Sequence, residues 1–104
     1  MSRIAQFARF TARSGYGQKV VEALETALAS ARTEPGTQVY AIHQQEDNPD
    51  VVWMYEVYAD ADARAAHSGS AATRTLRAAV GDLLAEPLTV SRCLVGHEFG
   101  LPTP

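Results

Sequence analysis

Cysteine is nearly absent from the 104-residue sequence, in which Cys93 stands alone. An intramolecular disulfide is therefore excluded, and a reducing compartment such as the cytoplasm is the expected location. Long apolar runs are also missing, since no stretch approaches the roughly 18 apolar residues that a membrane span needs. The first ten residues alternate and carry Arg3 and Arg9, unlike a secretory signal. We expect a protein without a membrane partner.

Basic clusters and common catalytic motifs are lacking as well. Nine Lys and Arg residues against twelve Asp and Glu residues give a formal net charge of −3, with no basic patch of the kind that binds nucleic acid. The sequence contains no Gly-rich phosphate loop, no G-x-S-x-G, no H-E-x-x-H and no Cys/His metal spacing. We therefore expect no nucleic-acid partner and no nucleotide or metal cofactor.

Hydrophobic residues are plentiful, at 46% of the chain, and their spacing changes along it. Alternation with a period of two predicts strands over residues 4–12, 37–45, 51–59 and 88–99. Helical spacing predicts helices over about 18–33, 60–68 and 71–85. This order is typical of an α+β fold of the ferredoxin-like, split βαβ type, with a four-stranded antiparallel sheet. We expect a single domain over residues 1–99 and a C-terminal tail over 100–104.

The segment 51–59 is unusual because both of its faces are bulky. Trp53 and Tyr55 point to one side, and Met54 and Tyr58 point to the other. A sheet covered by helices on one face should be polar on its second face. Exposing Trp53 and Tyr55 would leave an apolar patch in water. We therefore expect a second copy of the chain to cover this face in a homodimer; the alternative is that the tail or a loop covers it.

Glu56 and His67 are the leading candidates for chemistry. Glu56 lies in the middle of the apolar strand, where a carboxylate is costly unless it is paired or lines a cavity. Burial there would raise its pKa and suit it to carry a proton, while an ion pair with Arg64 or Arg74 is the structural alternative. His67 lies in a short helix, and its imidazole suits proton transfer near neutral pH, although such a histidine can equally be a surface or capping residue.

Other polar residues receive weaker or structural interpretations. Tyr40 is a further polar residue of interest, on the strand predicted over 37–45. His43 and His97 fall on predicted strands, and the sequence indicates no role for either. Cys93, also on a predicted strand, is interpreted as a small buried residue rather than a nucleophile.

Four local patterns, taken in order, resemble a known family. The most specific runs from Tyr55-Glu56-Val57-Tyr58-Ala59-Asp60 to Ala66-His67 and Ser70. The others are Glu34-Pro35-Gly36 followed by Tyr40, Pro49 in the hairpin, and Leu84-Ala85-Glu86-Pro87 before the last strand. Together they are similar to the antibiotic biosynthesis monooxygenase family of dimeric α+β barrel proteins. The sequence departs from the family pattern at Tyr58, Arg64, Ala71 and Thr73, where tryptophan, leucine, proline and phenylalanine are frequent.

The resemblance implies a ferredoxin-like fold that dimerises through its sheets into an α+β barrel, with a cavity between the sheet and the helices of each subunit. Glu56 and His67 match the family's recurrent acid and histidine, so they are the implied catalytic residues. The expected substrate-binding residues are Tyr40, Met54, Tyr58 and Arg64.

The family includes cofactor-free monooxygenases of quinols and anthrones, haem-degrading enzymes and sugar-phosphate isomerases. We expect a monooxygenase that needs no cofactor and oxidises an electron-rich phenolic, quinol or anthrone-type substrate with O2. His67 would accept or orient the proton, and Glu56 would position His67 or bind a substrate hydroxyl. The alternatives are a non-catalytic ligand-binding module and a haem-binding or haem-degrading protein. Haem ranks lower because that branch uses an asparagine on its first strand, for which Gln6 and Gln38 are poor substitutes.

Overall fold

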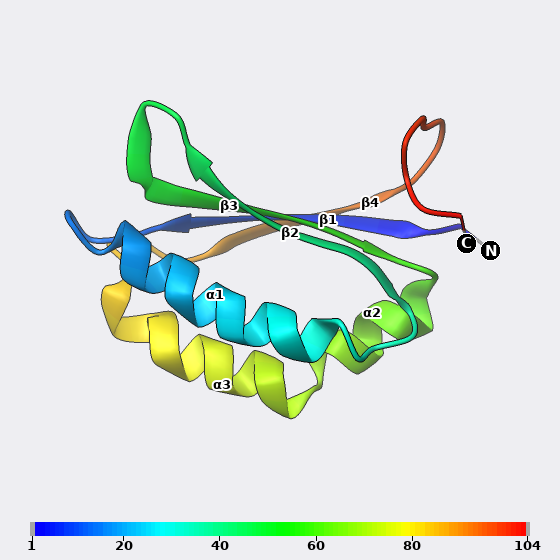
Figure 1. Ribbon diagram of the computed structural model, residues 1–104, viewed down its shortest axis with the longest axis horizontal. Coiled ribbons are helices and arrows are strands. Elements are labelled where there is room, and N and C mark those ends of the chain that lie inside the picture. Colours follow the sequence, from blue (N-terminus) through cyan, green and yellow to red (C-terminus); the bar gives the residue numbers. More distant parts are fainter. Residues whose placement is uncertain (1, 104) are drawn as a thin grey trace.

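The computed structural model describes residues 2–103 as a four-stranded antiparallel sheet with helices against one face (Figure 1). The strands are β1 (Ile4–Thr11), β2 (Thr37–Gln45), β3 (Asn48–Tyr58) and β4 (Thr89–Leu94), in the spatial order β2-β3-β1-β4. The helices are α1 (Gly17–Ala31), α2 (Ala61–Ser68), α3 (Ala71–Val80) and a 3-10 turn, η1 (Gly81–Leu83). The predicted α+β, ferredoxin-like fold is confirmed. Met1 and Pro104, the outer limits of the predicted domain and tail, lie outside the described residues.

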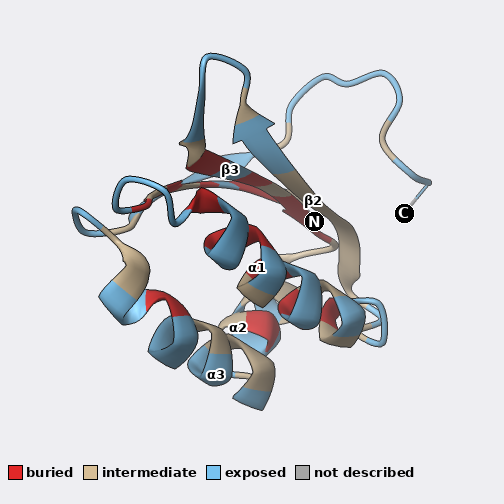
Figure 2. Cartoon of the chain, turned by 60° about the vertical axis from the view of Figure 1, so that its left-hand side comes forward, coloured by how far each residue is buried: buried red, intermediate tan, exposed pale blue. Residues whose placement is uncertain are grey.

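The core lies between the sheet and the helices, where alternating strand residues meet the apolar stripe of α1. Figure 2 shows the buried residues gathered on the surfaces that face each other across this layer. Met54 of β3 and Leu24 of α1 are at most 1% exposed, and burying a side chain of this size contributes about 1.5–3 kcal/mol. Helix α3 supplies fewer buried residues than α1, with Val80 as its buried anchor. Within residues 2–103, no helix has the length and apolar character to cross a membrane.

The start of α1 is fixed by the neighbouring strand β3. The carboxylate of Asp50 accepts hydrogen bonds from the backbone N–H groups of Gly15, at 3.0 Å, and Gly17, at 2.9 Å. A Cβ at Gly17 would lie 2.2 Å from the carbonyl oxygen of Pro49, so only glycine allows this close approach. The Asp50 contact thus holds the first turn of the helix against the sheet.

Helix α2 begins at an acidic cap. Asp60 accepts from the backbone N–H of Ala63 at 2.9 Å, which satisfies one of the free donors at the helix start. Ser70 performs the same role for α3 by accepting from the N–H of Thr73 at 3.2 Å. These two caps mark the starts of two separate helices, of which α3 runs beside α1 (Figure 1).

Three predicted boundaries were wrong, each because of backbone pairing. The helix predicted over 71–85 ends at Val80 and tightens into η1, after which the backbone is extended at Leu84. The carbonyl of Leu83 accepts from the N–H of Arg13, and the N–H of Ala85 donates to the carbonyl of Thr11, so this segment pairs with the end of β1 and with the residues that follow it. The strand predicted over 88–99 ends at Leu94, whose partner is Ile4, the first residue of β1. The strand predicted over 51–59 begins earlier, at Asn48, because the β2–β3 hairpin continues beyond the sheet.

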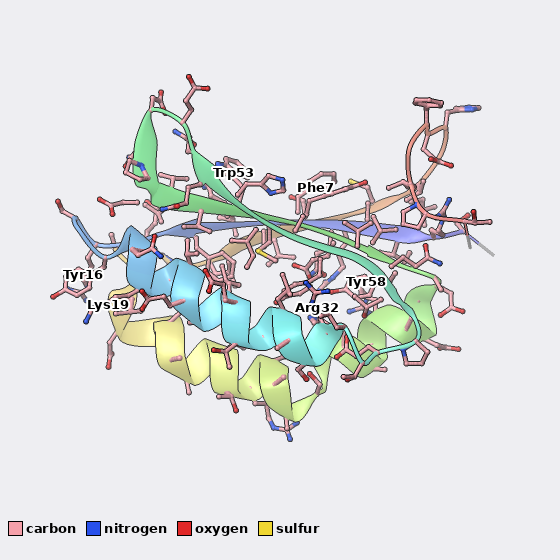
Figure 3. All side chains as sticks on the ribbon, in the orientation of Figure 1. Phe7, Tyr16, Lys19, Arg32, Trp53 and Tyr58 are labelled. Atoms are coloured by element: carbon pink, nitrogen blue, oxygen red, sulfur yellow. The ribbon has the colours of Figure 1, made fainter. Side chains whose placement is uncertain are left out.

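The second face of the sheet is open over part of its area. Phe7 is 42% exposed and Trp53 is 38% exposed, and both point away from the helices (Figure 3). The rings of Phe7 and Tyr55 are 5.2 Å apart, and the guanidinium of Arg9 lies 5.7 Å from the Trp53 ring. Aromatic side chains therefore form a connected apolar surface that the described residues leave exposed. We call this set of Phe7, Arg9, Trp53 and Tyr55 the outer aromatic patch.

The C-terminal segment lies over the other end of this face (Figure 1). Arg3 holds it there by donating to the carbonyl oxygen of Pro102 at 2.7 Å and by an ion pair with Glu98 at 3.4 Å. Val57, at this end of the face, has no exposed surface. The tail thus covers one end of the face, as the sequence allowed, and leaves the outer aromatic patch open.

The interpretation of Cys93 as a buried residue was wrong. Its strand, β4, is at the edge of the sheet and is exposed along its length. The thiol is free and exposed because α3 and the tail leave the outer side of this strand uncovered.

Candidate functional site

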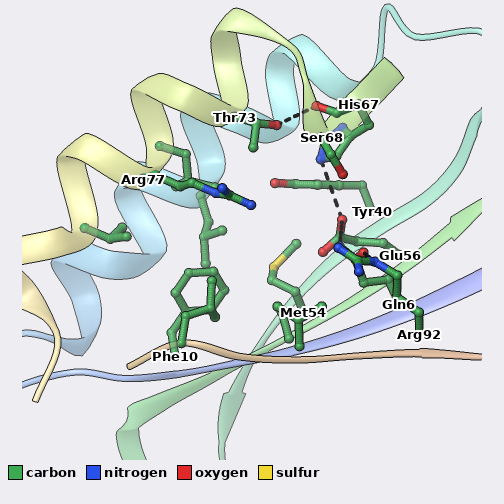
Figure 4. Close-up of a pocket in the computed structure, with 16 residues that line it drawn as sticks. Gln6, Phe10, Tyr40, Met54, Glu56, His67, Ser68, Thr73, Arg77 and Arg92 are labelled. Atoms are coloured by element: carbon green, nitrogen blue, oxygen red, sulfur yellow. Dashed lines mark hydrogen bonds and ion pairs between the residues drawn. The ribbon is translucent and has the colours of Figure 1, made fainter. Parts of the chain in front are cut away.

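A cavity of about 60 Å³ lies between the sheet and the helices, and Figure 4 shows the residues around it. Phe10, Leu24 and Met54 supply apolar wall. The polar side chains enter mainly from one side, where Glu56 and His67 meet. A mostly apolar cavity with a few converging polar groups is the usual form of a small-molecule site.

A single cross-strand row supplies most of the polar groups of the sheet. Tyr40 pairs with Glu56, Glu56 pairs with Gln6, and Gln6 pairs with Arg92, so that each strand contributes one member. Residues in register on neighbouring strands point to the same face of a sheet. The row is joined by hydrogen bonds from Arg92 Nε to Gln6 Oε1, at 2.9 Å, and from Gln6 Nε2 to Glu56 Oε1, at 3.2 Å.

Glu56 is almost completely buried, with 4% of its surface exposed. Its Oε1 accepts from the Tyr58 hydroxyl as well as from Gln6. Burial raises the pKa of the Glu56 carboxyl, and this effect exceeds the opposing influence of the Tyr58 hydroxyl and the nearby His67. Burial also raises the pKa of the Tyr40 and Tyr58 hydroxyls, with the Glu56 carboxylate adding to the effect. Both tyrosines therefore act as hydrogen-bond donors at neutral pH.

His67 lies between two carboxyl groups from different parts of the chain. Its Nδ1 is 2.8 Å from Glu34 Oε1, and its Nε2 is 3.6 Å from Glu56 Oε1. A carboxylate accepts from N–H, so the Glu34 contact favours the tautomer with the proton on Nδ1. Nε2 is then left with a lone pair on the side of Glu56 and the cavity.

Further contacts fix the imidazole ring of His67. The ring centroid is 5.5 Å from that of Tyr40 and 5.2 Å from that of Tyr58. Thr73 Oγ1 donates to the backbone carbonyl of His67 at 2.8 Å, which ties the end of α2 to α3. Glu34 is itself held because it accepts from the hydroxyl of Thr37 at 2.7 Å. These contacts hold the imidazole ring of His67 in place before any ligand binds.

The residues singled out from the sequence fall into three groups. Tyr40, Met54, Glu56 and His67 all line the cavity. Tyr58 is not among the described residues that line the cavity, but its hydroxyl donates to Glu56, which does line it. Arg64, on α2, lies outside the set of described residues that line it.

The ion pair considered for Glu56 is not formed with either arginine. The guanidinium of Arg74 donates to the carbonyl oxygen of Gly69 at 2.7 Å, which leaves Gln6, Tyr58 and His67 as the partners of Glu56. Among residues 2–103, no group of three His, Cys, Asp or Glu side chains is placed to hold a metal ion.

Four further residues at the site were missed in the sequence. Gln6 and Arg92 carried a signal, since their strands alternate so that both share a face with cavity residues. Arg77 was one polar residue on an amphipathic helix, with nothing in its spacing to separate it from Arg74. Glu34 appeared in the sequence only as part of the Glu34-Pro35-Gly36 pattern, because its contact with His67 spans 33 residues and depends on the tertiary fold.

Comparison with known proteins agrees with this geometry. The sequence profile of the family described as "Antibiotic biosynthesis monooxygenase" matches residues 3–79. That range includes Gln6, Glu34, Glu56 and His67 and ends before Arg92. A comparison with curated protein sequences finds no match.

Several solved structures are similar to this chain over its whole fold. The protein Rv0793 from Mycobacterium tuberculosis is 27% identical with a TM-score of 0.88, over 95% of this chain and 100% of that one. The NE2512 protein of unknown function from Nitrosomonas europaea is 25% identical with a TM-score of 0.85, over 100% and 98%. A Nitrosomonas europaea protein provisionally assigned as an antibiotic biosynthesis monooxygenase is 25% identical with a TM-score of 0.83, over 92% and 99%.

Proposed function

The chain belongs to the antibiotic biosynthesis monooxygenase family, and from this premise we propose that it oxidises an electron-rich phenol, quinol or anthrone with O2 without a cofactor. The observation that carries the proposal is the position of His67 between Glu34 and Glu56 at the edge of an apolar cavity. A base held in one orientation beside a site of low polarity is suited to remove a proton from a weakly acidic substrate.

His67 is the base in this reaction. Its Nε2 takes a proton from a phenolic O–H or from an activated C–H of the substrate. Glu34, at 2.8 Å from Nδ1, stabilises the imidazolium that forms, as the carboxylate does in a catalytic triad. Tyr40 and Glu56 lie beside the ring and supply hydrogen bonds to the substrate oxygen.

The remaining steps use only the substrate and O2. For an anthrone-type CH2 group, the carbanion passes one electron to O2, and the resulting radical and superoxide combine to form a C–O bond. Loss of the second proton, together with cleavage of the O–O bond and release of water, leaves a carbonyl group. The balance is R2CH2 + O2 → R2CO + H2O, so the substrate supplies all four electrons and no external reductant is needed.

Substrate contacts in this proposal come from Tyr40 and Met54, which line the cavity. Tyr58 acts through Glu56, to which its hydroxyl donates. Arg64 has no part in it because it does not line the cavity among the described residues.

A homodimer formed through the outer sheet face is part of the proposal. The outer aromatic patch supports it, because a connected apolar surface is stabilised when a second copy removes it from water. Light scattering after gel filtration should give twice the mass of the chain, and Trp53→Asp should give the monomer. Tyr16→Asp is the control, since Tyr16 is 42% exposed, against 38% for Trp53, but precedes α1. A monomeric native chain would contradict the dimer.

The cytoplasm stays the proposed location, because Cys93 is the single cysteine of the sequence and no intramolecular disulfide can form.

Oxygen uptake with a panel of hydroquinones and anthrones tests the activity directly. His67→Ala should lower the rate about 100-fold or more, as expected for loss of a general base. His43→Ala is the matched control, because His43 is exposed and its Nδ1 contacts the Trp53 carbonyl on the strand. If the folded native chain consumed no oxygen with any compound of the panel, the proposed activity would be contradicted.

A binding module without catalysis is the second candidate, because Tyr40, Gln6 and Glu56 converge on the cavity and can hold a polar ligand without any proton transfer. The volume of about 60 Å³ is well below the roughly 300–1,000 Å³ of typical ligand pockets, so a ligand of either kind must displace side chains of the wall. A ligand bound with no oxygen uptake would support this candidate. The same volume argues against haem, and a titration followed at the Soret band would detect haem binding.

A further inference from the structure

The cavity is lined by two arginines that the chemistry proposed above does not use. Arg77 comes from α3 and Arg92 from β4, and both are in its wall. In Figure 4 the guanidinium of Arg92 lies near Gln6 and Glu56, whereas that of Arg77 reaches toward the middle of the cavity from the opposite side. Glu56 is the one acidic residue among the described residues that line the cavity. The lining therefore has more cationic than anionic groups.

The two guanidinium groups differ in the hydrogen bonds that they already make within the protein. Arg92 uses its Nε to donate to Gln6 at 2.9 Å. Arg77 makes neither a side-chain hydrogen bond nor an ion pair with any residue from 2 to 103, although other arginines of the chain do. Arg74, on the same helix, is engaged with the carbonyl oxygen of Gly69. Within the described part of the chain, Arg77 is thus a free cation facing the site.

Arg77 is an exposed residue that also lines the cavity, so a ligand in the cavity meets a guanidinium that has no protein partner among the described residues. A neutral ligand would displace part of its water without pairing the charge. An anionic oxygen group would instead form charge-assisted, bidentate hydrogen bonds with it, and these are among the strongest contacts that a protein makes. The free side chain therefore favours an anionic ligand.

The positions of Arg77 and His67 are related through α3. Thr73 Oγ1 donates to the carbonyl oxygen of His67 at 2.8 Å, and Arg77 follows Thr73 by four residues, about 6 Å along the axis. His67 and Arg77 both line the cavity, so a ring with a hydroxyl at one end and an anion at the other offers a group to each of them.

We propose that the ligand of this site is a hydroxylated aromatic acid whose carboxylate is bound by Arg77, while its hydroxyl lies at His67 and Glu56. This assignment rests on the proposed function for the placement of the hydroxyl, and it names the substrate class of that reaction. Arg77 acts in specificity, since it is not required for the proton transfer.

Calorimetric titration of the full chain with 4-hydroxybenzoate and 4-hydroxybenzamide tests the charge preference without any turnover. The two probes have nearly the same shape, and only the first carries a charge. We expect the acid to bind at least 10-fold more tightly to the native chain. Arg77→Gln should reduce this ratio to about 3 or less, and Arg74→Gln, the control on the same helix, should leave it unchanged.

Equal affinities of the native chain for the two probes would overturn the inference, and so would failure of both to bind. A ratio that persists in the folded double variant Arg77→Gln, Arg92→Gln would also overturn it. Comparison of the two probes on the native chain keeps the test valid if a variant does not fold.

The outcome is separable from that of the proposed function. Oxygen uptake that is equal for 2,5-dihydroxybenzoate and its uncharged amide would keep the monooxygenase and contradict the role of Arg77. Tight binding of the acid with no oxygen uptake would support the role of Arg77 and contradict the monooxygenase.

Discussion

Nδ1 of His67 lies 2.8 Å from Oε1 of Glu34, so a residue in the loop after α1 orients a residue on α2. This contact sets which nitrogen of the imidazole faces the cavity. It also places a negative charge where the ring becomes positive when it accepts a proton.

Glu34→Gln should lower kcat about 10- to 100-fold with little change in KM, because the amide keeps the shape but loses the charge that stabilises the imidazolium. Glu34 positions His67, so a purely structural role must be distinguished. The conservative variant Glu34→Asp does this, since a shorter carboxylate should restore part of kcat while the amide should not. Glu25→Gln, on the exposed side of α1, is the control. Equal kcat values for Glu34→Gln and the native chain would contradict the role of Glu34.

Glu56 should make the stability of the protein depend on pH. Burial raises the pKa of this carboxyl above its usual 4.5, so the folded chain holds the proton more tightly than the unfolded chain. The stabilisation is therefore fully present below pH 4.5 and is lost as pH rises through the folded-state pKa. A tenfold difference in proton affinity between the folded and unfolded chains corresponds to about 1.4 kcal/mol in the free energy of unfolding.

Urea denaturation of the native chain and of Glu56→Gln, carried out from pH 4 to pH 8, checks this dependence. The native chain should lose stability relative to the variant as pH rises across this interval. If the difference in free energy of unfolding between the native chain and Glu56→Gln did not change with pH, the pKa of Glu56 would be the same in the folded and unfolded chains.

Gly36 and Ala63 set how closely the loop after α1 approaches α2. A Cβ at Gly36 would lie 2.4 Å from the Cβ of Ala63, and the carbonyl of Gly36 also accepts from the N–H of Ala59 at 2.9 Å. Gly36→Ala should therefore cost about 1–3 kcal/mol through overpacking. Thermal denaturation should show a lower Tm, and the double variant Gly36→Ala, Ala63→Gly should recover part of the loss.

The control for this pair is Gly81→Ala. No atom lies within 4 Å of a Cβ at Gly81, whose backbone is helical, so that variant should be neutral or slightly stabilising. Equal losses at Gly36 and Gly81 would mean that the Ala63 contact has no special cost.

Leu76 should control how large a substrate the cavity accepts. Its side chain lines both the cavity and a groove of about 330 Å³ between α1 and α3 that is lined mainly by small residues. Leu76→Ala should join the two spaces, at a stability cost of about 2 kcal/mol. The ratio of kcat/KM for a three-ring anthrone to that for a one-ring quinol should then rise.

Leu83→Ala is the matched control for Leu76, because Leu83 packs on the core but does not line the cavity among the described residues. It should lower stability while leaving the substrate ratio in place. The role of Leu76 would be contradicted if its removal left that ratio unchanged.

The fold could be predicted from the sequence because its local patterns agree with the tertiary structure. Strand alternation placed Glu56 on the inner face together with Met54, and Trp53 on the outer face. Helical spacing over about 60–68 matches α2, which Asp60 caps. Such features depend on neighbours in the sequence and can be recognised without knowledge of the packing.

The remaining features depend on contacts between distant segments. The end of α3 at Val80 is set by backbone pairing of Leu83 and Ala85 with the end of β1, which outweighs their helical spacing. The orientation of His67 depends on Glu34, which the sequence showed only as part of the Glu34-Pro35-Gly36 pattern. Arg64 was expected at the cavity from the family resemblance, but it is not among the described residues that line the cavity, although it precedes His67 by three positions on α2.

The contact between Arg3 and Pro102 has a consequence for how the chain can be reconnected. Since residues 3 and 102 are in direct contact, a short linker can join the two ends without crossing the sheet. The chain can then be reopened at the exposed turn Glu46–Asp47, beyond the part of β3 that pairs with β1. Such a circular permutant should retain the cavity, because none of the residues that line it belongs to the joined ends or to the new ends.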